Sequence, residues 1–531
     1  MTVSPTSLTR TYDLVGFGDE VPGILALVAA AREFNRRTGR RLRTLLMLKG
    51  QAQEGVGGHL VRGGLSYLDR STVPLDVRLA YGLPTFGDPS RLYLEFLRRS
   101  DVQDIGLDPR KANTALRSML SEIGADILSR AQIKSVIKQG DRLAGIELTR
   151  GETYLARQFI DASVNAELAQ FAGVPKYQGF GTFGLPESEL PVTLTFETEG
   201  LSVQQLQATE LAYIRRFTNP KDLEAQQYLA IATGSNQKQA EQFRQGMVDS
   251  RGNPRTMYVA PDHIDVLCRA LCVAYHSYRG KKFNLAESGY VFDQPNIALL
   301  PGGRLSWNAF LIYTSGSQAE VLARGAARPS AAMLEEFKFV ERWIRSLGAR
   351  VVRPAPELYI RHAGNVAQVV QPISGAEMLS GGVPAEEAFG SFSYYLDVRG
   401  GITGLGPKAL EKGFSSISFH SIAIFNIGMQ HALIRTVPNL AVISPASGFD
   451  GYASGAGRII EFNAGVGQGV GIAAALALLS NRNLATISNR EVNQVLLQTG
   501  QLPCIYGRPD PVEAARLKEF ELAMAAGVAI A

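Results

Sequence analysis

The segment from Gly18 to Gly23 has the residue types and spacing of a turn that can hold a pyrophosphate. Glycines in such a turn let the backbone bend tightly and approach an anion at a helix N-terminus, where free amide groups favour negative charge. Gly18 and Gly23 stand at the first and last glycine positions of the pattern G-x-G-x-x-G. Glu20 holds the middle position, so a carboxylate stands where the dianion should lie. The pattern alone is weak evidence, and its context decides its weight.

The residues around this turn predict a strand, a helix and a second strand. Residues 12–18 (YDLVGFG) indicate a short strand that ends in glycines, and residues 24–34 are apolar and Ala-rich over three turns. Residues 42–48 (LRTLLML) indicate a second buried strand. This succession predicts a βαβ unit with parallel strands. Lys49 replaces the acid expected after the second strand, where a ribose hydroxyl would bind.

Few side chains are candidates for catalysis. His59 lies in a glycine-rich segment and could act as an acid or base, although a polar side chain satisfied within a loop is the plainer interpretation. Arg399 could hold an anionic substrate through two N–H groups, and a structural ion pair would explain it equally well. No metal site is predicted, because the cysteines lack further ligands nearby. The cysteines are Cys268, Cys272 and Cys504.

Several segments resemble, in order, motifs of the FAD-dependent oxidoreductases with the glutathione-reductase-like two-dinucleotide-binding fold. The resemblance extends from residue 12 to about residue 500. It implies a bound FAD and hydride transfer between an unknown organic substrate and flavin N5. The segments are 57–69 (GGHLVRGGLSYLD), 159–169 (FIDASVNAELA), 394–400 (YYLDVRG), and Arg458 followed by 467–475 (GQGVGIAAA).

The resemblance also implies roles for individual residues. Gly18 and Gly23 would face the FAD pyrophosphate, and Glu167 would lie near the ribityl and pyrophosphate groups. Gly57 and Gly58 would let the backbone approach the ribityl chain and the flavin. A glycine-rich segment would open the last helix, whose N-terminal amides stabilise negative charge on reduced flavin. The remaining cofactor-binding candidates are Lys49, Arg458 and, in that segment, Gly467, Gln468 and Gly469.

Departures from the family motifs keep two alternatives open. Glu20 and Lys49 replace a glycine and an acid, and Val164 replaces the glycine of an A-T-G sequence. One alternative is a relative of these flavoproteins that has lost FAD and acts as a binding or assembly protein. The other is a nicotinamide enzyme in which Lys49 binds a 2′-phosphate.

The predicted fold class is α/β, with a discontinuous Rossmann-like FAD-binding domain around a parallel sheet and an inserted α+β cap. Residues 1–174 and 396–500 are expected to form the FAD-binding domain, and residues 175–395 the cap or substrate domain. Residues 501–531 would form a C-terminal tail. Polar helices fill the middle of the chain, and buried-strand character returns at residues 440–443, which should rejoin the N-terminal sheet.

Composition limits the classes of protein that fit. Of 531 residues, 45% are hydrophobic and 19% charged, which excludes a mainly disordered chain. A net charge of +5 on a chain of this length does not indicate nucleic-acid binding. The three cysteines fit a reducing compartment. We therefore expect a cytoplasmic protein that acts on a small molecule and binds no nucleic acid.

The sequence also predicts no transmembrane segment and no signal peptide. No apolar run approaches the roughly 18 residues of a membrane span, and the N-terminus lacks an apolar core. The basic run from Arg36 to Arg43 fits a solvated turn after a helix. Contact of that run with phosphate or an anionic membrane surface is the alternative.

Overall fold

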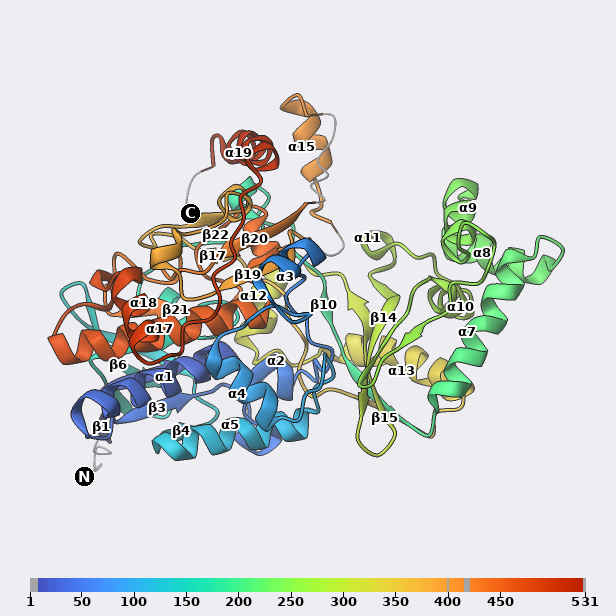
Figure 1. The fold of residues 1–531 in the computed structure, drawn as a ribbon. Helices are drawn as coiled ribbons and strands as arrows, with labels where there is room; N and C mark the ends of the chain where they lie inside the picture. Colours follow the sequence, from blue (N-terminus) through green and yellow to red (C-terminus); the bar gives the residue numbers. More distant parts are fainter. Residues whose placement is uncertain (1–7, 399–400, 415–420, 529–531) are drawn as a thin grey trace.

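A five-stranded parallel sheet forms the centre of the computed structural model, which describes residues 8–398, 401–414 and 421–528 (Figure 1). Strand β21 comes from the C-terminal part of the chain and pairs with β8, so the prediction that residues 440–443 rejoin the N-terminal sheet is confirmed. The α/β fold class is confirmed with it. In spatial order the strands are β21 (Leu440–Val442), β8 (Gln158–Asp161), β2 (Leu14–Phe17), β3 (Thr44–Met47) and β4 (Asp126–Leu128).

The parallel sheet is covered on both faces. Side chains alternate along each strand, so Leu14 and Leu46 face a layer of helices while Val15 and Leu45 face a second sheet. The helical layer contains α1 (Val21–Thr38), α4 (Arg91–Arg99), α5 (Pro109–Ile123) and α17 (Ile460–Ser480). The second sheet has the order β1 (Thr9–Thr11), β7 (Thr153–Leu155), β6 (Arg142–Leu148) and β5 (Ile133–Gln139).

Helix α17 is the one helix among the described residues that is long and apolar enough to cross a membrane. It has 21 residues and a mean hydropathy of 1.5 in its most apolar window, and 89% of that window is buried inside the protein. Glycines let it pack closely on α1: a Cβ at Gly467 would lie 2.3 Å from the carbonyl oxygen of Pro22. The expectation that no apolar run approaches the length of a membrane span is therefore wrong for residues 460–480, which lie here in the protein core.

The inserted segment forms a seven-stranded, mainly antiparallel sheet with its own core, drawn in green and yellow in Figure 1. That core extends from Val192 to Ala363. Its strands are β12 (Tyr258–Val259), β13 (His263–Asp265), β14 (Tyr290–Leu300), β15 (Arg304–Ile312), β11 (Phe196–Glu199), β16 (Val351–Pro354) and β10 (Val192–Thr193). Its helices are α7 (Val203–Thr218), α8 (Leu223–Thr233), α9 (Gln237–Gly246), α10 (Ala270–Arg279), α11 (Leu285–Ser288), α12 (Gly316–Arg324) and α13 (Ala331–Ser346).

After Ala363 the chain leaves the core of the inserted sheet and packs against the elements around the parallel sheet. Met378, Phe389 and Phe392 belong to the same apolar cluster as α1 and α17, although the expected cap extends to residue 395. The domain boundaries stay a prediction. Three strand pairs join here: β17 (Asn365–Val366) with β9 (Lys176–Tyr177), β18 (Ile373–Ser374) with β22 (Phe449–Asp450), and β19 (Ser391–Tyr395) with β20 (Ile422–Asn426).

Short helices complete the fold. The C-terminal α19 (Pro511–Ala525) contacts α14 (Gly375–Leu379), so the expected tail forms part of the folded body. The other helices are α2 (Gly58–Val61), α3 (Leu75–Tyr81), α6 (Glu167–Phe171), α15 (Leu405–Glu411), α16 (Ala453–Gly457) and α18 (Asn489–Gln498).

Candidate functional site

The candidate site is the crevice at the carboxyl ends of β2, β3 and β8. Ligands of open α/β sheets bind at this edge, and Gly18, Lys49 and Ser163 follow the three strands here. The open space that remains has a volume of about 60 Å³. Sites for organic ligands measure roughly 300–1,000 Å³. The crevice is therefore nearly filled by the protein itself.

The side-chain carboxyl groups of Asp19 and Glu20, in the glycine turn, accept hydrogen bonds from backbone amides at the start of α2. Asp19 Oδ2 accepts hydrogen bonds from the backbone N–H groups of Gly57 (2.9 Å) and Gly58 (3.3 Å). Glu20 Oε1 accepts one from the N–H of His59 (3.1 Å). Gly57 and Gly58 have φ values of +134° and +47°, which turn these amides toward the carboxylates. The amides assigned to the cofactor by resemblance thus already have acceptors.

Arg62 lies behind these carboxylates and neutralises one of them. Its guanidinium donates to Asp19 Oδ2 (2.5 Å) and Oδ1 (2.8 Å), and its Nε donates to Glu357 Oε1 (2.7 Å). Burial alone would raise the pKa of Asp19, but the charge and hydrogen bonds of Arg62 and the glycine amides hold that pKa below its usual value. Because Glu357 comes from the inserted segment, this ion-pair network joins the two parts of the fold.

Among the described residues, Glu20 pairs with no lysine or arginine; its Oε2 lies 3.5 Å from Nδ1 of the neutral His59 imidazole. Burial raises the pKa of Glu20 to about 8, and the adjacent charge of Asp19 contributes in the same direction. The hydrogen bond from the His59 amide opposes this effect but does not cancel it. The Glu20 carboxyl group is therefore mainly protonated at neutral pH.

Replacing Glu20 with glutamine should stabilise the protein at alkaline pH. Because the pKa of Glu20 is higher in the folded state, the folded protein binds more protons, and stability falls as pH rises from about 4.5 to about 8. Glutamine avoids this penalty, so Glu20→Gln should gain roughly 2–4 kcal/mol at pH 8 and nothing at pH 4. Urea unfolding at pH 4, 6 and 8 measures the difference. The exposed Glu411→Gln provides the control; equal curves for Glu20→Gln and wild type would contradict the pKa assignment.

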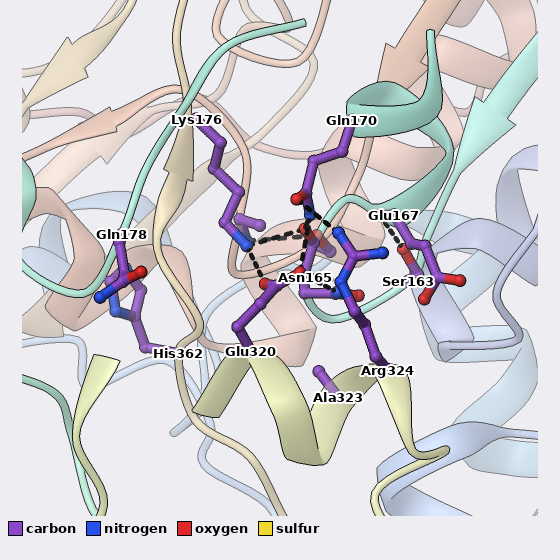
Figure 2. A network of polar contacts seen from close by, with 12 residues as sticks. Ser163, Asn165, Glu167, Gln170, Lys176, Gln178, Glu320, Ala323, Arg324 and His362 are labelled. Atoms are coloured by element: carbon purple, nitrogen blue, oxygen red, sulfur yellow. Dashed lines mark hydrogen bonds and ion pairs between the residues drawn. The ribbon is translucent and has the colours of Figure 1, made fainter. Parts of the chain in front are cut away.

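Helix α12 of the inserted segment lies against the loop after β8 (Figure 2), and Ala323 near its end lines the crevice. Lys49 donates to the Glu167 carboxylate and, at 3.1 Å, to the carbonyl oxygen of Ala323 at the end of α12. Glu320 on α12 pairs with Lys176 at 2.5 Å and accepts a hydrogen bond from Asn165 Nδ2 at 3.0 Å. These contacts fix α12 against the loop after β8, where a dinucleotide would have to enter.

His59 is buried among groups that already satisfy it. Its Nε2 accepts a hydrogen bond from the backbone N–H of Ile360 (3.2 Å), and its ring lies edge-to-face on Tyr359. Burial, with a smaller contribution from the charge of Arg62, lowers the pKa of His59 to about 3. The imidazole is neutral at physiological pH. The structure therefore gives His59 a packing and hydrogen-bonding environment, and its catalytic role stays a prediction.

Gly18 and Gly23 are required by packing between the elements of the βαβ unit. A Cβ at Gly18 would lie 2.3 Å from the backbone nitrogen of Ser163, and one at Gly23 would lie 2.2 Å from Cβ of Ala162. Both contacts join the turn to the residues after β8. Packing alone therefore explains why glycine is found at both positions, without a bound ligand.

The expectation that residues 467–469 open the last helix is wrong. Helix α17 begins at Ile460, so Gly467, Gln468 and Gly469 lie in its interior. Gln468 accepts a hydrogen bond from the N–H of Leu92 and donates one to Gln501, and a Cβ at Gly469 would lie 2.5 Å from the ring of Phe389. Glycine at these positions lets neighbouring elements pack closely on the helix, and the backbone N–H groups lie in the interior of α17 and not at its N-terminus.

The two arginine candidates have different outcomes. Arg458 is buried and pairs with Asp397 at 3.1 Å and Asp69 at 3.5 Å, so it serves as the centre of an ion-pair cluster. Arg399 lies outside the described residues.

Two residues of the site, Arg62 and Glu357, were not predicted from the sequence. Arg62 lies inside the glycine-rich motif and could have been noticed, whereas nothing in the sequence marks Glu357.

A parallel sheet with a glycine turn, a helix packed on it and an inserted antiparallel sheet define a flavoprotein-type fold. The chain belongs to the family described as FAD dependent oxidoreductase, whose sequence model matches residues 21–496. Comparison with curated protein sequences gave no match.

Solved structures that resemble the chain do so distantly. They include a geranylgeranyl bacteriochlorophyll reductase-like protein from Thermoplasma acidophilum, 11% identical, with a TM-score of 0.36 over 98% of this chain and 88% of that one. L-proline dehydrogenase from P. horikoshii is 11% identical, with a TM-score of 0.34 over 93% of this chain and 100% of that one. Halogenase PltM is 11% identical, with a TM-score of 0.36 over 92% and 73%. At these scores the likeness adds no argument about function.

The described residues do not fit FAD. The open space of about 60 Å³ at the turn is smaller than the roughly 300–1,000 Å³ of pockets that enclose small organic ligands. The amides of Gly57, Gly58 and His59 are used by Asp19 and Glu20, and a pyrophosphate would meet these carboxyl groups directly.

Proposed function

We propose that this chain is a member of the FAD-dependent oxidoreductase family that no longer holds FAD and acts as a binding protein. The observation that carries the proposal is the pair of carboxyl groups, Asp19 and Glu20, seated on the amides at the start of α2. They supply from within the chain the acceptor atoms that the pyrophosphate supplies in a dinucleotide-binding protein.

Electrostatics support the proposal. A pyrophosphate at this turn would lie beside the Asp19 carboxylate, and like charges in a buried site repel strongly. Moving Asp19 aside would break its buried ion pair with Arg62, which would keep only Glu357 as a carboxylate partner. Helix α12 would also have to give up its contacts through Lys49 and Glu320.

The second candidate function is FAD-dependent transfer of a hydride between an organic substrate and flavin N5. The match of the family model over residues 21–496 favours it. In that case Glu20→Gly should tighten FAD binding, because the change restores the glycine of the motif and removes a carboxyl group from the anion site.

Flavin content distinguishes the two functions. We expect purified protein to be colourless, to release no flavin on heat denaturation and to show no saturable binding when titrated with FAD. Thermal unfolding with and without FAD provides a second readout, because a ligand that binds the folded state raises the melting temperature. Stoichiometric flavin in the wild-type protein, or saturable binding of added FAD by the wild-type protein, would reject the proposal in favour of the enzyme.

A further inference from the structure

Residues 321–328, the last turn of α12 and the turn after it, have an unusual backbone. Ala326 and Ala327 have φ values of +55° and +54°, in the left-handed region that residues with a Cβ rarely adopt. Within the described ranges, no other two consecutive residues that both carry a side chain have positive φ. Glycine is the usual residue at such a helix end, because it adopts this conformation without steric cost. The surrounding structure must therefore hold the two alanines in place.

Hydrogen bonds and an ion pair hold this turn on both sides. Ala327 donates its backbone hydrogen bond to the carbonyl oxygen of Leu322 at 2.9 Å, and its own carbonyl oxygen accepts one from the N–H of Leu358 at 2.7 Å. Arg328, the next residue, forms an ion pair with Glu54. Because Glu54 follows β3, this ion pair ties the turn to the part of the fold around the parallel sheet.

Further polar contacts hold the end of α12 against the same part of the fold. Lys49 donates to the carbonyl oxygen of Ala323 at 3.1 Å, and Arg324 Nη2 donates to Gln170 Oε1 at 2.7 Å (Figure 2). The side chain of Arg324 is 41% exposed, so water can replace its partner when this contact separates. Ala319, one turn earlier, is fully buried in the core of the inserted segment. The start of α12 is therefore anchored by apolar packing, and its end by polar contacts.

The same residues form part of the wall of the crevice. Ala323, Ala326 and Ala327 line it, together with Gly18 and Lys49. An outward movement of residues 321–328 would therefore enlarge the crevice without disturbing the parallel strands that form its floor.

We propose that residues 321–328 form a lid that opens and closes the crevice at the carboxyl ends of β2, β3 and β8. In the closed state, which the structure shows, the contacts of Lys49, Arg324 and Arg328 hold Ala326 and Ala327 in the left-handed conformation. In the open state the two alanines take the ordinary right-handed conformation, and water replaces the polar partners. The lid controls access to the crevice. The inference goes beyond the proposed function and holds whether or not FAD binds.

Acetylation of Lys49 in the full-length protein measures the opening of the lid. The Lys49 side chain is 12% exposed, and its amine contacts Glu167 and the carbonyl oxygen of Ala323. Brief treatment with N-hydroxysulfosuccinimide acetate, followed by peptide mass spectrometry, gives the rate of labelling. Lys134, 58% exposed, reports the intrinsic rate. Hydrogen exchange provides a second readout: the amides of residues 321–328 should exchange faster than those of β2, which open only when the core unfolds.

Replacing Ala326 with glycine should favour the closed lid. Glycine adopts the left-handed conformation without steric cost, so both the acetylation of Lys49 and the amide exchange of residues 321–328 should slow at least about fivefold. The matched control is Ala332→Gly, an exposed position in the right-handed helix α13. It should leave both rates unchanged.

Removing the outer partners of the lid should have the opposite effect. The double variant Glu54→Gln, Gln170→Ala takes away the partners of Arg328 and Arg324, and both rates should rise about fivefold. Wild-type rates in Ala326→Gly or in the double variant would overturn the proposal. So would amide exchange of residues 321–328 as slow as that of β2, or a Lys49 rate that does not follow the exchange. FAD uptake is measured separately, so failure here leaves the proposed function intact.

Discussion

Replacing Arg62 with methionine should lower the free energy of unfolding by about 3–5 kcal/mol. Methionine fills part of the same volume, but Asp19 and Glu357 would be left buried without a cation. Urea unfolding at pH 7 measures the effect. The loss should shrink at pH 4, where the two carboxyl groups can protonate and no longer need a counter-charge.

Two controls separate this effect from a general sensitivity to arginine replacement. Arg353→Met removes an exposed arginine 3.8 Å from Glu199 and should change stability by less than about 0.5 kcal/mol. The triple variant Arg62→Met, Asp19→Asn, Glu357→Gln should recover much of the loss, because it removes all three charges together. A loss below about 1 kcal/mol in Arg62→Met would show that the network is not held as described.

Adding a single methyl group at Gly467 or Gly471 should destabilise the protein by about 2–3 kcal/mol. The Cβ at Gly467 would lie 2.3 Å from the Pro22 carbonyl oxygen, and at Gly471 2.2 Å from that of Ala26. Both atoms are backbone of α1, so the two helices would have to separate. Chemical unfolding of Gly467→Ala and Gly471→Ala provides the measurement.

Gly406→Ala is the matched control for these helix glycines. Gly406 lies within α15, and a Cβ there would meet nothing within 4 Å. Because Gly406 lies in the first turn of α15 and precedes Pro407, alanine there should change stability by less than about 1 kcal/mol. If alanine at 467 or 471 had the same small effect as at 406, the close approach of α1 and α17 would be incorrect.

The sequence predicted the parts of the fold that depend on local pattern. Apolar runs and glycine spacing located β2, α1 and β3, and the apolar residues 440–443 located β21. These features share a short range: the residues that carry the signal are also the residues that make the contact.

The candidate site was only partly predictable. The position of the turn at Gly18 was correct, but its closure by Arg62, Glu357 and α12 depends on side chains that are distant in sequence and carry no periodic pattern. The glycines at 467–469 were misplaced for a different reason. Glycine marks helix ends and close helix contacts alike, and the sequence alone does not distinguish these uses.

The ion pair between Arg62 and Glu357 can form only late in the synthesis of the chain. The two residues are 295 positions apart, and chains are made at roughly 5–20 residues per second, so Arg62 waits about 15–60 s for its second carboxylate. During this interval Arg62 has the Asp19 carboxylate and the Gly55 carbonyl oxygen as its partners. The ion-pair network that joins the two parts of the fold is therefore completed only after Glu357 has been synthesised.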